Sequence, residues 1–192
     1  MQLVRSLSVL LVVVAACSRE ASKPEPTLIE VSAADAGRGK AIIGELKKSL
    51  VAALTRALAD GVPQAIAVCN TEAPKLAAAA GRDGAVVGRA TRKPRNPANE
   101  ATGWQAEALA QFEQLRAART PLDGQSFTRR LPSGRIAYAE PLVIQALCLT
   151  CHGSSLAPDV VAALAERYPN DRATGYAEGD LRGVAWVELP AR

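Results

Sequence analysis

The sequence contains few of the residues that most often coordinate metals or transfer protons. Among 192 residues there is one histidine, His152, and one methionine, the initiator Met1. Two tryptophans, three tyrosines and two phenylalanines are few for a protein core of this size. Any chemistry that needs an imidazole must therefore use His152 or not occur at all.

Long apolar runs and strong charge of one sign are also lacking. After the first twenty residues no stretch is long and apolar enough to cross a bilayer. The formal net charge is +4, and the basic residues are dispersed apart from one group, which argues against a nucleic-acid partner. The length and the 48% hydrophobic content fit one globular domain with a short extension. The one basic group consists of Arg89, Arg92, Lys93 and Arg95.

The N-terminus has the pattern of an export signal. Arg5 precedes an apolar run over residues 7–16, which is the right length for the central region of a signal peptide. Cys17 follows two alanines, and the stretch resembles a bacterial lipoprotein signal, in which the cysteine is lipidated and anchors the chain to a membrane. The alternative is an ordinary cleaved signal peptide that leaves Cys17 as a free thiol. The expected parts are a signal peptide over 1–16, a tether over 17–33 and a periplasm-facing domain over 34–192 in the bacterial cell envelope.

Hydrophobic periodicity predicts an α+β domain. Ser32 and Asp35 have capping-box spacing and precede a long helix that runs to about Asp60. Turn residues and alternating segments then predict a small antiparallel sheet flanked by helices. The expected elements are short helices over 63–69 and 73–80, a strand over 85–90, a helix over 102–119, a hairpin from 127–131 and 135–139, and a last strand over 183–189.

Residues 148–152 form the most specific motif, Cys-Leu-Thr-Cys-His. This is the C-x-x-C-H pattern of covalent haem c, in which Cys148 and Cys151 add to the two vinyl groups and His152 is the proximal iron ligand. A thioredoxin-like pair is the first alternative, but no βαβ pattern precedes the motif. Half of a zinc site is the second, and it would need Cys69 and carboxylates as further ligands. The expected export favours one covalent haem c over both alternatives, because haem is attached to such motifs outside the cytoplasm.

The sixth iron ligand cannot be a methionine or a second histidine, because the mature chain has neither. The position is either open or held by Cys69, a lysine, a tyrosine, an asparagine, a backbone group or water. Cys69 is the one thiol left after lipidation and haem attachment, although a buried free cysteine is a common alternative. An anionic thiolate would stabilise ferric iron, and its release on reduction would make a switch.

Four separated motifs resemble a known family, the c-type haem domains with a PAS-like fold. These domains occur alone or fused to sensor kinases and chemoreceptor-like proteins. The resemblance implies haem held by Cys148 and Cys151, with His152 and Cys69 as the iron ligands. One departure is Gln105, where the family often has glutamate. The motifs are 65–69, 95–99 followed by Trp104, 148–153, and 168–176 continuing into 179–183.

The loop from Arg95 to Asn99 is a second candidate for haem contact. Arg95 and Asn96 would line the haem pocket, and the four clustered cations are candidates for binding the propionates. The alternatives are a solvated face for the cations and a turn cap for Asn96.

The leading functional hypothesis is a lipid-anchored monohaem protein that senses redox state or a diatomic gas and signals through a protein partner. An electron-transfer cytochrome tethered to the envelope is the alternative. A haem peroxidase is disfavoured, because it needs a distal proton shuttle and the one histidine is already used. An enzymatic role is therefore left open but not favoured.

Overall fold

A computed structural model describes residues 31–191 of the chain. The expected signal peptide, Cys17 and most of the expected tether lie outside these residues. Five α-helices, two short 3₁₀ turns and four strands make up the described part. In chain order they are α1 (Ala33–Leu58), α2 (Val62–Ala80), β1 (Val86–Ala90), η1 (Pro97–Asn99), α3 (Gly103–Ala117), β2 (Phe127–Arg130), β3 (Ile136–Val143), η2 (Ala146–Cys148), α4 (Leu149–His152), α5 (Pro158–Arg167) and β4 (Leu181–Leu189).

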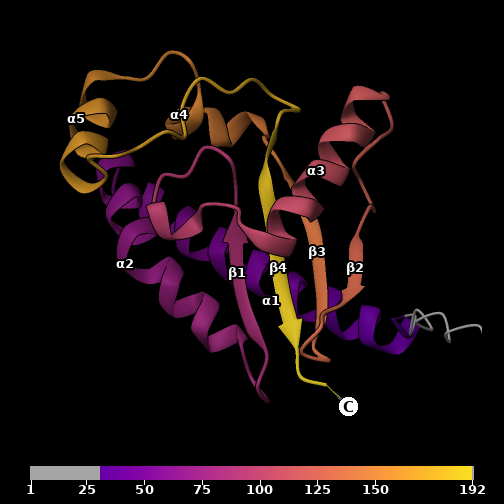
Figure 1. Cartoon of the computed structure of the whole chain (residues 1–192). Coiled ribbons are helices and arrows are strands. Elements are labelled where there is room, and N and C mark those ends of the chain that lie inside the picture. Colours follow the sequence, from indigo (N-terminus) through magenta and orange to yellow (C-terminus); the bar gives the residue numbers. More distant parts are fainter. Residues whose placement is uncertain (1–30, 192) are drawn as a thin grey trace, which may run out of the picture.

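The four strands form one antiparallel sheet in the order β1-β4-β3-β2. The last strand in the sequence therefore lies inside the sheet, between the first and the third (Figure 1). The predicted hairpin is confirmed, with Phe127 opposite Ala139 and Arg130 opposite Ile136. The α+β class, the small antiparallel sheet flanked by helices and the long N-terminal helix are confirmed.

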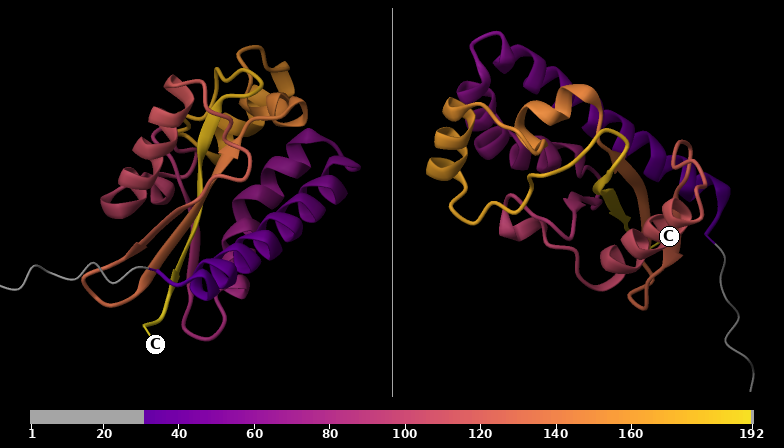
Figure 2. Two further views of the ribbon diagram at one scale, coloured as in Figure 1. Left: turned by 90° about the vertical axis from the view of Figure 1, so that its right-hand side faces the viewer. Right: turned by 90° about the horizontal axis from the view of Figure 1, so that it is seen from above.

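The helices cover both faces of the sheet. Helices α1 and α2 lie on one face and α3 on the other, while α4 and α5 lie beyond one end of the strands (Figure 2). On the α1 face, Ile43 packs with Tyr138 and Val187. On the opposite face, Phe112 and Trp104 of α3 pack against small residues of the sheet. The sheet is thus buried on both sides, which accounts for its largely apolar strands.

Helix α1 begins where the sequence predicts. The Ser32 hydroxyl accepts a hydrogen bond from the Asp35 amide at 3.1 Å, and it donates to the Asp35 carboxylate at 2.7 Å. This arrangement satisfies the first free amides of the helix. Ile43 and Leu46 are buried, and Ile43 packs against the sheet, so this side of α1 belongs to the core.

Helix α2 corrects the prediction of two short helices. It runs unbroken from Val62 to Ala80 with Pro74 inside it, and Gly81 ends it as expected. Proline removes one helical hydrogen bond, here the one that the Asn70 carbonyl would accept. The helix continues because α2 packs along both α1 and α5.

Helix α5 is absent from the sequence-based expectations. Pro158 begins it, Asp159 lies in its first turn and Arg167 in its last, all of which favour a helix. Val160 and Leu164 are buried against Ile66 of α2. Among the helices of residues 31–191, none is sufficiently long and apolar for a membrane crossing.

Candidate functional site

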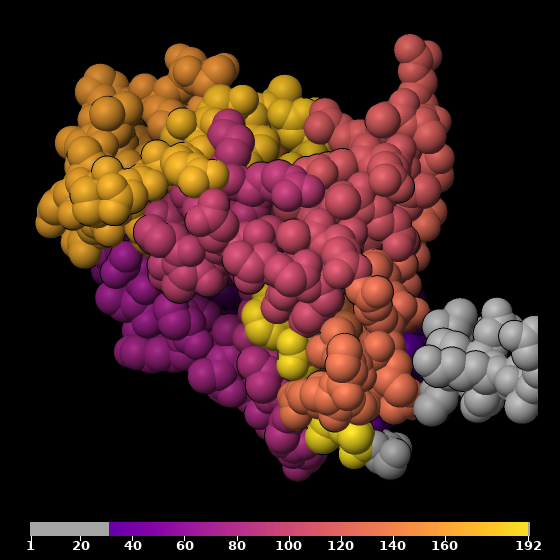
Figure 3. Space-filling view, in the orientation of Figure 1, coloured from indigo at the N-terminus to yellow at the C-terminus, as the bar shows by residue number. Residues whose placement is uncertain are grey.

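A cavity of about 550 Å³ lies between α2, β1 and the segment that follows β1. Figure 3 shows the surface hollowed between α2 and this segment. On the helix side the lining side chains are small, with Ala73, Ala77 and Ala78 facing the cavity. On the sheet side, a Cβ at Gly88 would lie 2.6 Å from the Trp186 ring, so glycine is needed there. The cavity is therefore lined mostly by small apolar residues.

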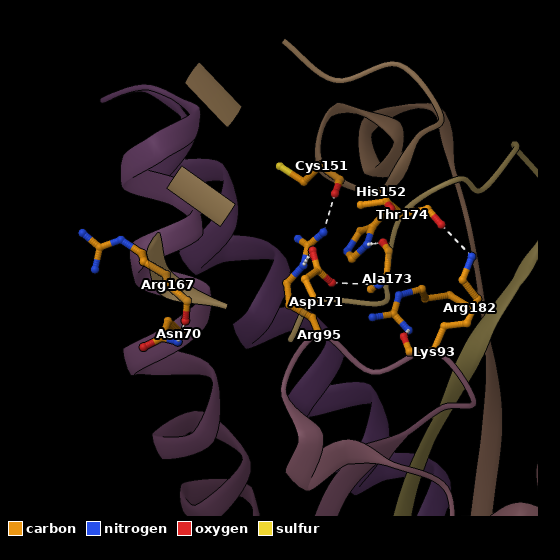
Figure 4. Close-up of polar contacts among 10 residues, drawn as sticks. All are labelled: Asn70, Lys93, Arg95, Cys151, His152, Arg167, Asp171, Ala173, Thr174 and Arg182. Atoms are coloured by element: carbon orange, nitrogen blue, oxygen red, sulfur yellow. Dashed lines mark hydrogen bonds and ion pairs between the residues drawn. The ribbon is translucent and has the colours of Figure 1, made fainter. Parts of the chain in front are cut away.

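His152 borders this cavity and is held in one tautomer. Its Nδ1–H donates to the Ala173 carbonyl at 2.6 Å, which leaves the Nε2 lone pair available to a ligand (Figure 4). Burial first, and then the positive charges of Arg95 and Arg182, lower the pKa of His152 to about 3. The ring is therefore neutral at physiological pH, as an iron-ligating imidazole must be.

The peptide around His152 is also fixed through its backbone. The Tyr176 amide donates to the His152 carbonyl at 3.0 Å, and the Gly175 amide donates to the Gly153 carbonyl at 2.9 Å. The Tyr176 ring meets the imidazole edge-on, with the centroids 6.3 Å apart. Residues 173–176 therefore hold the histidine from both its ring and its main chain.

Cys69 lines the same cavity as His152 from the middle of α2. Burial raises the pKa of the Cys69 thiol, while the charges of Arg89 and Arg95 partly oppose that effect. The free side chain is therefore a neutral thiol at physiological pH. Segments more than eighty residues apart in the sequence thus bring the two predicted iron ligands to one cavity.

The two cysteines of the C-x-x-C-H motif, Cys148 and Cys151, do not line this cavity. The Cys151 sulfur points toward α2, away from the His152 ring (Figure 4), and packs against an apolar cluster that includes Ile66 and Leu164. Burial raises the pKa of Cys151; Arg95 opposes this, and the nearby Cys69 and Cys148 thiols add to it. Cys148 lines a second hollow, of about 1280 Å³, which shares Leu142 with the first. Within residues 31–191, no three His, Cys, Asp or Glu side chains form a group that could hold a metal ion.

The cationic residues predicted to bind propionates divide into two pairs. Arg89 and Arg95 line the cavity. Arg92 instead pairs with Glu113 at 2.9 Å, and Lys93 donates to the Thr174 carbonyl at 2.6 Å, so neither lines it.

Asn96 also lines the cavity, but its side-chain oxygen accepts from the Ala98 amide at 3.0 Å. Its carboxamide therefore caps the turn, which is the alternative considered for it above. Asn96 thus shapes the cavity mainly through the backbone that it holds.

Three residues near the site had no assigned role in the sequence. Arg182 lines the cavity and donates to the Thr91 hydroxyl at 2.9 Å. Ala173 accepts the histidine proton, and Asp171 accepts from the Ala173 amide at 2.7 Å. All three lie in the motif over 168–183, one of the four that carry the family resemblance.

The two tryptophans have different positions. Trp186 lines the cavity. The Trp104 ring packs edge-on against the Trp186 ring, with the centroids 5.7 Å apart. The Trp104 indole donates to Glu188 at 2.7 Å and lies in the core on the α3 face. Trp104 therefore supports the cavity wall from behind.

Comparisons with known proteins identify the family. The Tll0287-like family (Tll0287) matches residues 9–190. A solved structure, that of the cyanobacterial heme-protein Tll0287, is similar with 26% sequence identity and a TM-score of 0.60, and the match covers 83% of this chain and 97% of that one. No protein with curated function matches. Because the family match spans nearly the whole sequence, the chain belongs to the Tll0287-like family.

Proposed function

We propose that this protein binds one covalent haem c and senses redox state or a diatomic gas through it. The observation that carries the proposal is the shared cavity of His152 and Cys69, with the His152 Nδ1–H already bound to Ala173. A hydrogen bond at Nδ1 that frees Nε2 is the arrangement found at metal-ligating histidines. The similar solved structure is that of a heme-protein, which supports the same cofactor.

The residues of the cavity fit a porphyrin. A volume of about 550 Å³ lies in the usual range of about 300–1,000 Å³ for cofactor pockets. The small apolar side chains of α2 leave room for a flat apolar ring. Arg89 at the same cavity could pair with a propionate. Arg95 also lines the cavity, but its guanidinium already pairs with Asp171.

When bound, haem would supply an iron that changes oxidation state and accepts a sixth ligand. His152 Nε2 and Cys69 Sγ, the latter as a thiolate, would hold the iron. Cys148 and Cys151, whose side chains do not line the cavity in this structure, would have to turn toward it to form the thioethers of the C-x-x-C-H motif. A Cys69 side chain that is not bound to iron would carry its proton, because its burial disfavours the charged form.

A ligand that leaves on reduction suits a sensor better than an electron carrier. A carrier works fastest when its ligands change little between oxidation states. A sensor needs an iron position that opens in one state, so that a gas or a structural change can follow. We further propose that the signal passes to a protein partner.

Export and lipid anchoring are further parts of the proposal. They rest on the signal-like run over 7–16 and on Cys17 directly after two alanines. A lipid anchor in the bacterial envelope would place the domain facing the periplasm.

The test compares the full-length protein with its Cys69→Ala variant, using absorption and electron paramagnetic resonance spectra of the ferric and ferrous forms. We expect covalent haem in both, a low-spin thiolate signal in the ferric wild type alone, and carbon monoxide binding to the reduced wild type. Thr71→Ala, an exposed change two residues along α2, is the control and should match the wild type.

Three results would contradict parts of the proposal. Haem that is absent or extractable would exclude haem c. A thiolate signal that persists in Cys69→Ala would exclude Cys69 as the ligand. A ferrous form that keeps its thiolate and refuses carbon monoxide would favour the electron carrier over the sensor.

A further inference from the structure

Asp171 makes two hydrogen bonds at the edge of the candidate haem site. Its Oδ2 accepts from Arg95 Nε at 3.0 Å, and its Oδ1 accepts from the Ala173 amide at 2.7 Å. Both side chains of the ion pair are only 11% exposed. A pair this buried exchanges little with water, so its geometry is fixed by the protein.

Arg95 extends this contact to the haem peptide. Its Nη2 donates to the Cys151 carbonyl at 2.5 Å, next to His152 (Figure 4). The Arg172 amide also donates to the Pro94 carbonyl at 3.0 Å, which ties the segment of Arg95 to that of Asp171. Arg95 therefore joins the loop after α5 to the C-x-x-C-H peptide.

Ala173 connects this ion pair to the imidazole. Its amide is bound by Asp171, while its carbonyl accepts the His152 Nδ1–H at 2.6 Å. Ala173 is completely buried, so water cannot replace either contact. A shift of the Asp171 carboxylate would therefore move the acceptor of the histidine proton.

We propose that Asp171, held by Arg95, is a positioning residue that sets the strength of the hydrogen bond from His152 Nδ1 to Ala173. The inference rests on the proposed haem function. A stronger hydrogen bond at Nδ1 makes the imidazole a more basic ligand, which favours ferric iron and lowers the reduction potential. Asp171 thus tunes the potential from the second sphere of the iron, without touching the haem.

The chain offers a matched control. Asp180 also pairs with an arginine, Arg116, and also accepts from a nearby backbone amide, that of Ala177 at 2.8 Å, which precedes it in the sequence. Asp180 has no contact with Ala173 or His152 among the hydrogen bonds of the described residues. Asp171→Asn and Asp180→Asn therefore make the same chemical change in two carboxylates that pair with an arginine and a backbone amide, of which Asp180 is the more exposed.

The experiment uses the full-length holoprotein in its diamagnetic ferrous form, under carbon monoxide if the ferrous iron is high-spin. Because the sequence contains one histidine, its Nδ1–H gives one unambiguous proton signal. We expect this proton to exchange with solvent about tenfold or more faster in Asp171→Asn, since a weakened hydrogen bond opens more often. The midpoint potential should rise in the same variant. Asp171→Glu should restore part of both effects, and Asp180→Asn should match the wild type.

The inference is overturned if Asp171→Asn and Asp180→Asn leave exchange and potential equally unchanged. Failure of the haem proposal looks different, because the wild type itself would then carry no covalent haem. In that case the inference is tested by the nitrogen chemical shifts of the His152 ring in the haem-free full chain, which report its tautomer. A Nδ1–H tautomer that is lost in Asp171→Asn supports the inference, and one that persists overturns it.

Discussion

Glu140 joins side chains from two layers of the molecule. It accepts a hydrogen bond from the Tyr138 hydroxyl at 2.9 Å within β3, and it pairs with Lys47 of α1 at 2.5 Å. Burial first, and then the hydrogen bond and the charge of Glu140, raise the pKa of Tyr138 to about 12. The phenol is therefore held in its neutral form far above physiological pH.

This raised pKa makes stability depend on alkaline pH. An unfolded tyrosine loses its proton near pH 10, whereas the folded one holds it to about 12. The contribution of Tyr138 is therefore complete below pH 10 and declines as the pH rises from 10 to 12. Urea unfolding at pH 9 and 11 should show a smaller loss of stability in Tyr138→Phe than in the wild type. Equal losses in the two proteins would show that Tyr138 titrates normally.

Among single residues, the sequence was most informative about the residue types that are rarest in it. With one histidine and few cysteines, counting alone brought attention to His152 and Cys69, and the structure places both at one cavity. Asp171 and Arg182 could not be assigned in this way, because arginines and aspartates are common and these two act through contacts 76 and 91 residues away.

At the scale of elements, α1 contains two glycines in opposite surroundings. A Cβ at Gly39 would lie 2.5 Å from the Tyr138 ring, whereas one at Gly44 would have nothing within 4 Å. Gly39 therefore lets the helix approach the sheet closely, and Gly44 has no such role.

The same substitution should have opposite effects at these two glycines. Gly44→Ala should stabilise the protein by about 0.5–1 kcal/mol, because alanine favours the helix. Gly39→Ala should destabilise it by about 1–3 kcal/mol, because the methyl group overpacks the contact with Tyr138. Urea unfolding of both variants measures the difference. A stabilised Gly39→Ala would mean that α1 can move away from the sheet at little cost.

The proline inside α2 is the second prediction at this scale. Pro74→Ala restores an amide that can donate to the Asn70 carbonyl, and it removes the steric clash of the ring. Helix stability should rise, by up to about 3 kcal/mol, with a higher urea midpoint. Because Pro74 lines the cavity, haem content should be measured alongside. An unchanged or lower midpoint would indicate that α2 packs only in the shape that the proline imposes.

Element boundaries followed the sequence where local signals were strong. The Ser32 cap, the hairpin and the last strand were predictable, since capping and alternation are local effects. Helix α2 was predicted as two pieces, over 63–69 and 73–80, whereas its packing on α1 and α5 supports one unbroken helix. The order β1-β4-β3-β2 and the cavity between α2 and β1 depend on long-range packing, which residue patterns do not encode locally.

For the whole molecule, the expected anchor gives a prediction at Cys17. Cys17→Ser should abolish incorporation of labelled fatty acid and move the protein from the detergent phase to the aqueous phase in a phase-separation assay. The physical reason is the loss of acyl chains, each of whose buried methylenes contributes about 0.8 kcal/mol to membrane binding. Cys69→Ala is the matched control and should stay in the detergent phase. A wild type found in the aqueous phase would favour the ordinary signal peptide.

The central position of β4 also bears on the timing of assembly. The sheet cannot close until its last strand in the sequence has emerged, because β4 pairs with both β1 and β3. The segment from Ala173 to Tyr176, which forms hydrogen bonds with His152, comes only just before that strand. We therefore expect an exported chain to present its C-x-x-C-H peptide open and reachable from the moment that peptide emerges until β4 follows it, and to enclose it only in that final step.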